Sequence, residues 1–72
     1  MPLAWIAKPS DLTLCLSGYP LRIRLHTGRE HPYTLEMDGK PPRVYSSLAR
    51  AKADAICSAR EWDEEMARIL AD

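Results

Sequence analysis

The sequence predicts a small α+β domain: an antiparallel meander of three to four strands, with one long or two short C-terminal helices packed on one face. Apolar and polar residues alternate from Leu12 onward, which is the period of strands with one buried face. Asp38-Gly39 is a strong hairpin signal, because type I′ turns need positive φ at both central positions. From Ser46 the apolar spacing changes to steps of three and four, the period of a helix.

The 72 residues suffice for one domain and one small core. We expect a single domain over residues 1–72, divided into an N-terminal arm (1–10), a β-meander (11–45) and a helical segment (46–71). A chain of this size buries only about 60% of its unfolded surface. The sequence is 46% apolar but contains no Phe, so the core must consist mainly of Leu, Ile and Ala.

Three strands of the meander follow from strict alternation. Their inward residues are expected to be Leu12, Leu14 and Leu16, then Leu21, Ile23 and Leu25, then Tyr33, Leu35 and Met37. A fourth strand, over residues 43–45, is expected to be short and to lie at an edge. It follows the Pro41-Pro42 pair, and prolines have no N–H to donate to the hydrogen bonds between strands.

The helix is expected to begin at Ser46 or Ser47, whose side-chain oxygen can cap the first turn. Its apolar stripe consists of Leu48, Ala51, Ala55, Ala59, Trp62, Met66 and Ile69. Some two dozen helical residues span about 36 Å, whereas strands of five to seven residues span about 17 to 23 Å. The last three turns should therefore extend beyond the sheet. The alternative is a break near Ser58 that gives two helices.

The bulky end of this stripe is the first candidate site. Trp62, Met66, Ile69 and Leu70 have the spacing of anchors that insert into a hydrophobic groove, and Trp is common among binding hot spots. Glu61 and Glu65 provide an acidic flank. We therefore expect non-enzymatic binding of another protein, or of a second copy as a two-fold homodimer. The alternative is that Trp5 and its neighbours fold back over these side chains as ordinary core.

Compact chains of this kind, without a cofactor and with segregated charge, are typical of bacterial or phage accessory proteins. Such proteins include inhibitors that bind host enzymes or defence complexes. The basic and acidic residues are also unevenly distributed here. Residues 1–45 hold six Lys and Arg against four Asp and Glu, and residues 46–72 hold four against six.

DNA binding is the second hypothesis. Arg22 and Arg24 alternate on the outer face of the second strand, and Arg43 is expected nearby, so that two guanidinium groups could read base edges. In its strand-strand-strand-helix order over residues 12–59, the chain resembles the DNA-binding modules of plant transcription factors and phage-integrase arm domains. That resemblance implies a sheet laid into the major groove. The net charge of zero, however, is unlike a general nucleic-acid binder.

Other classes receive little support. The histidines and cysteines, His26, His31, Cys15 and Cys57, match no closed zinc-site spacing, and we expect no metal, no cofactor and no enzymatic activity. The longest apolar runs are a few residues, far below the roughly 20 that span a bilayer, and no signal peptide is recognisable. We therefore expect a cytoplasmic protein with reduced thiols; a Cys15–Cys57 disulfide is the alternative.

Overall fold

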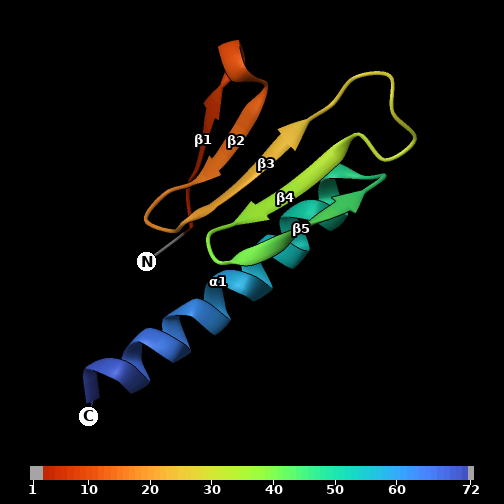
Figure 1. The fold of residues 1–72 in the computed structure, drawn as a ribbon. Coiled ribbons are helices and arrows are strands. Elements are labelled where there is room, and N and C mark those ends of the chain that lie inside the picture. Colours follow the sequence, from red (N-terminus) through yellow and green to blue (C-terminus); the bar gives the residue numbers. More distant parts are fainter. Residues whose placement is uncertain (1–2, 72) are drawn as a thin grey trace.

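The computed structural model describes residues 3–71 as one antiparallel sheet followed by one helix (Figure 1). The elements are β1 (Trp5–Lys8), β2 (Thr13–Leu16), β3 (Leu21–Leu25), β4 (Tyr33–Met37), β5 (Lys40–Tyr45) and α1 (Leu48–Ala71). The strands are ordered β1-β2-β3-β4-β5, so the predicted α+β class and meander are confirmed. Residues 1, 2 and 72, which belong to the expected arm and domain, lie outside the described residues.

The expected strand number is wrong, because the N-terminal segment supplies a fifth strand. Over residues 1–10 we expected an arm, but β1 pairs antiparallel with β2, with Trp5 opposite Leu16 and Lys8 opposite Thr13. β1 is four residues long and lies at the edge of the sheet. Such a short run is too brief to display the period of two, and its pairing with β2 is what makes it a strand.

Leu12 is the exception among the predicted inward residues. A short 3₁₀ helix, Pro9–Asp11, connects β1 to β2, and Leu12 then adopts a left-handed conformation with φ of 50°. Its side chain is 49% exposed. Because the chain reverses here, β2 begins one residue later than the alternation suggested. The two other leucines that were predicted to face inward do so: Leu16 is fully buried and Leu14 is half-buried.

The two edges of the sheet differ. β5 lies at the edge opposite β1, as predicted, but it runs over Lys40–Tyr45 and includes the Pro41-Pro42 pair, so the expected start at residue 43 is wrong. Prolines are tolerated at edges, where one side of the strand has no partner. A register shift between Leu35 and Met37 of β4 accompanies the pairing.

α1 is one continuous helix, so the alternative of a break near Ser58 is wrong. The hydroxyl of Ser47 accepts a hydrogen bond from the Arg50 N–H at 3.3 Å, which confirms the predicted capping by this serine. The helix begins at Leu48, so this bond gives a partner to one of the N–H groups that the first turn leaves without one.

The core lies between the sheet and the first half of α1. Ala51, Ala55 and Ala59 are at most 1% exposed, and they pack against buried sheet residues, namely Leu16, Leu21, Ile23 and Leu35. Because alanine side chains are small, the helix axis can approach the sheet closely. Leucine and isoleucine from the strands then fill the layer between them, as the composition predicted.

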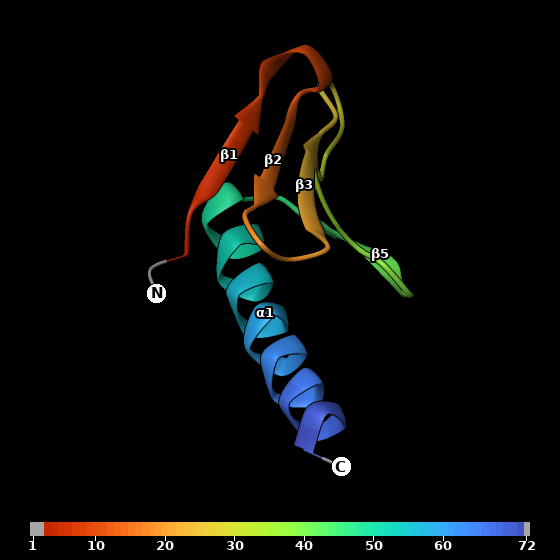
Figure 2. The same cartoon turned by 90° about the vertical axis from the view of Figure 1, so that its left-hand side faces the viewer.

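The second half of α1 extends beyond the sheet, as Figure 2 shows. The molecule measures 46 × 21 × 19 Å, and its long dimension reflects a 24-residue helix with a rise of about 1.5 Å per residue. The predicted mismatch between helix and strand lengths is therefore present. We call residues 60–71 of α1 the overhang.

Candidate functional site

The apolar residues of the overhang continue the face of α1 that covers the sheet. Trp62 follows Ala55 by seven residues and Met66 follows Ala59 by seven, which is about two helical turns. Ile69 then repeats the position of Trp62. We call Trp62, Met66, Ile69 and Leu70 the apolar stripe. Trp62 and Met66 are half-buried, whereas Ile69 is 58% exposed and Leu70 79% exposed.

The N-terminal segment is held in the sheet as β1, and its tryptophan lies against the first half of α1. Trp5 is part of β1 and packs against the core, with the Lys52 ammonium 5.8 Å from the centroid of its ring. Lys52 lies ten residues before Trp62 in the helix. Ile6 is 50% exposed, so it is not folded under α1 either. Trp5 itself therefore lies beside the first half of α1, whereas its neighbour Leu3 lines a groove with Ala59 and Arg60 at the base of the overhang.

A groove of about 480 Å³ marks the place where α1 leaves the sheet. Leu3, Ala4 and Ser17 line one side together with Tyr19, and Ala59, Arg60 and Asp63 line the other. The Tyr19 hydroxyl donates a hydrogen bond of 2.6 Å to the Asp63 carboxylate. This bond raises the pKa of Tyr19, because the phenolate would face a negative charge and lose its acceptor. It also joins the turn between β2 and β3 to the base of the overhang.

The charges around the stripe are mostly acidic. Residues 60–71 contain Glu61, Asp63, Glu64 and Glu65 against Arg60 and Arg68. Glu61 and Glu65 are exposed, and the Glu61 carboxylate lies 3.9 Å from the Lys40 ammonium at the turn between β4 and β5. Glu61, at the base of the overhang, is therefore close to the end of the sheet, and Glu65 lies one turn further along the overhang.

The structure brings Arg22 and Arg24 together, but around a carboxylate. The Nε atom of each lies 2.7 Å from the same Glu36 Oε1, and Arg22 Nη1 is 3.9 Å from Asp38. Burial raises the pKa of Glu36, but hydrogen bonds from the two guanidinium groups outweigh it and leave this pKa lowered. The ionised Glu36 thus offsets part of the positive charge on the face of the sheet away from α1.

Arg43 does not join them. It lies opposite Leu35 in the register of β4 and β5 and therefore on the face of the sheet that carries α1. There its Nη1 atom is 3.1 Å from an Asp54 carboxylate oxygen, which also accepts a hydrogen bond from the Tyr45 hydroxyl. The predicted three-arginine surface is split between two faces, because Arg43 is in register with an inward residue.

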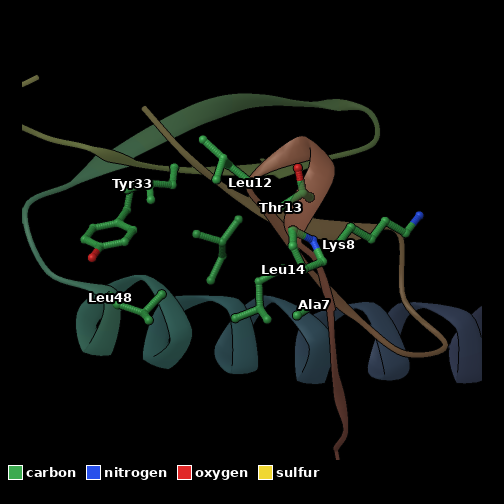
Figure 3. Close-up of a pocket in the computed structure, with 10 residues that line it drawn as sticks. Ala7, Lys8, Leu12, Thr13, Leu14, Tyr33 and Leu48 are labelled. Carbon is green, nitrogen blue, oxygen red and sulfur yellow. The ribbon is translucent and has the colours of Figure 1, made fainter. Parts of the chain in front are cut away.

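An apolar cavity of about 270 Å³ lies at the other end of α1, between its first turn and the sheet (Figure 3). Its lining comes from the first four strands, the connection between β1 and β2, and the helix. It includes Leu12, Leu14, Ile23, Leu25, Tyr33 and Leu48. Sequence reasoning missed this cavity, because no local pattern reports which apolar side chains leave space between them. Its walls are suited to apolar groups rather than to acid–base chemistry.

The cysteines and histidines are dispersed. Cys15 is half-buried and Cys57 exposed, and both are free thiols, so the disulfide alternative is wrong. Over residues 3–71, no group of three or more His, Cys, Asp and Glu side chains is placed to hold a metal ion. No helix in the described part of the chain combines the length and the apolar character needed to cross a membrane.

The fold and these surfaces define a class: a small α+β domain that backs a five-stranded meander with one helix and projects half of that helix away from the sheet. Comparisons with protein-family models, with curated proteins and with solved structures each find no match to this chain. The site is therefore interpreted from its own residues.

Proposed function

We propose that the protein is a non-enzymatic binding module that acts in the cytoplasm and uses the overhang of α1 to bind another protein. The observation that supports this proposal is the apolar stripe, which continues past the sheet and ends with Ile69 58% and Leu70 79% exposed. An amphipathic helix that lays such a face into a groove is a recurrent mode of recognition. Trp62, at the base of the stripe, is the expected hot spot.

The charges of the overhang indicate the chemistry of the partner. Four carboxylates against two guanidinium groups surround the stripe, so a complementary partner has an apolar groove with a basic rim. A second copy is a poorer fit, because two overhangs packed about a two-fold axis would bring their acidic flanks together. We therefore assign the overhang to a foreign protein, for which this small domain would act as an accessory subunit or inhibitor.

The test compares capture by three purified forms of the full chain. The wild type and an Ala53→Gln control, altered on the exposed side of α1 within the sheet-covered half, should retain the same protein from an extract of the source cells. The Trp62→Ala, Met66→Ala variant should not. The dissociation constant for the purified partner, measured by calorimetry, should rise by at least about 30-fold in that variant, which is the expected effect of losing one hot-spot side chain.

Circular dichroism establishes that each form is folded before capture is compared. Equal affinity of the folded double variant and the wild type would refute the assignment to the stripe. Binding of duplex DNA, lost in an Arg22→Ala, Arg24→Ala variant and falling steeply between low and moderate salt, would instead favour the DNA-binding hypothesis. An apolar helix contact should change little over the same range of salt.

A further inference from the structure

The two edges of the sheet are not equally protected against pairing with another strand. The β5 edge carries Lys40 and the Pro41-Pro42 pair, which are the kinds of residue that block edge-to-edge association. The β1 edge has the uncharged run Trp5, Ile6 and Ala7 before Lys8. Within residues 3–71, β2 is the only strand paired with β1. One side of β1 therefore exposes backbone groups that a further strand could bind.

The register identifies which backbone groups these are. The Ser17 N–H donates to the Ala4 carbonyl at 2.8 Å, so the backbone of Ala4 faces β2. Backbone groups of successive strand residues point to alternate sides, so Ile6 also faces β2, whereas Trp5 and Ala7 face the free side. Each of these two residues offers one N–H donor and one carbonyl acceptor at the edge.

We propose that β1 pairs antiparallel with β1 of a second copy, about a two-fold axis that passes through Ile6. In this register Trp5 lies opposite the partner's Ala7, and Ala7 lies opposite the partner's Trp5. Both residues of each pair face the free side, so their donors and acceptors meet. The two five-stranded sheets then form one continuous sheet with β5 at both outer edges, where the prolines prevent further growth.

The side chains favour this register. Ile6, which is 50% exposed, meets the partner's Ile6 on the face away from α1, and an apolar pair directly opposite is stabilising. Lys8 lies opposite the partner's Ala4, so no like charges face each other. A shift of two residues towards the C-terminus would place Pro9, which has no N–H, opposite Trp5.

This contact is separate from the overhang and does not depend on the proposed function. Two short strands bury little area, so the dimer belongs to the weak class of interfaces. Its axis is perpendicular to the sheet, and both copies of α1 therefore lie on the same face. A dimer would present two overhangs to a partner with two binding sites, and such bivalent binding gains affinity without any new contact.

The test is sedimentation equilibrium of the full chain over a range of concentrations. The wild-type mass should rise from the monomer value of 8.2 kDa towards twice that value. Ala7→Pro removes an N–H on the free side while the hydrogen bonds to β2 remain, and it should stay monomeric. Ala7→Val is the matched control, because it also adds bulk but keeps the donor, and it should still dimerise.

A charge exchange at Ile6 tests the two-fold register. Ile6→Lys and Ile6→Glu each place like charges opposite each other, so each should raise the dissociation constant of the dimer by about tenfold or more. An equimolar mixture of the two variants should dimerise again, because opposite charges then meet. Both are changes at a half-exposed site, so they decide the question even if Ala7→Pro fails to fold. A wild type that stays at the monomer mass, or Ile6→Lys that dimerises normally, would overturn the proposal.

Discussion

Replacing Ala55 with Leu should destabilise the domain much more than the same change at Ala53. Ala55 is 0% exposed and packs in the core with Ile23 and Leu35, whereas Ala53, half a turn away, is exposed to solvent. The two substitutions add the same isopropyl group to the same helix and have the same effect on helix propensity. Their difference therefore measures how closely the helix lies on the sheet.

The expected cost at Ala55 is about 1–3 kcal/mol, the usual range for overpacking a filled core. A chain of 72 residues has a total stability of about 4–11 kcal/mol, so this loss is a large part of it. With a urea m-value near 1 kcal/mol/M, typical of the smallest domains, the unfolding midpoint should fall by about 1–3 M. At Ala53 the change should stay within about 0.5 kcal/mol.

Urea unfolding followed by circular dichroism at the helix band gives both midpoints in one assay. Equal midpoints for the two variants would refute the reasoning, because they would mean that α1 is not held against the sheet at the distance that alanine permits. A selective loss at Ala55 with an unchanged m-value would support it, since the denatured state is then the same in both.

Two further predictions concern groups with shifted pKa values. Folding lowers the pKa of Glu36 below its ordinary value of 4.5, so its stabilising pairs with Arg22 and Arg24 are present above that pH and are lost as the pH falls through the folded-state pKa. Glu36→Gln should therefore reduce the loss of unfolding free energy between pH 7 and pH 3. An unchanged pH dependence of the unfolding free energy would contradict this. The hydrogen bond to Asp63 raises the pKa of Tyr19 above 10.0; ultraviolet titration of the wild type against Asp63→Asn should show one tyrosine that ionises earlier in the variant, and identical curves would argue against the bond.

Local patterns were sufficient for much of the fold. The alternation in β3 predicted buried Leu21 and Ile23, and the steps of three and four predicted the alanine face of α1. The same patterns failed at β1, which is too short to show a period, and at Leu12, where one left-handed residue breaks the alternation. They also placed the start of β5 too late, because an edge strand tolerates prolines that a central strand would not.

For the candidate site, the sequence specified the residues of the stripe but not what surrounds them. The spacing of Trp62, Met66, Ile69 and Leu70 is a local property, and so is the acidic flank. Whether Trp5 would lie over them depended on strand pairing, which is a long-range property. The pairing of Trp5 with Leu16 removes it from the overhang.

By itself, the sequence determined the class of the fold and the inward residues of the central strands, and it predicted a helical segment too long for the strands while leaving a break near Ser58 open. These follow from periodicity and from fixed rises per residue. Only the tertiary structure decided that the N-terminal segment is an edge strand, that Glu36 lies between Arg22 and Arg24, and that Arg43 binds Asp54 on the other face. The physical reason is that such contacts depend on how separate elements pair and pack, and they join residues up to 14 positions apart, whereas a periodic pattern reports only on the element that contains it.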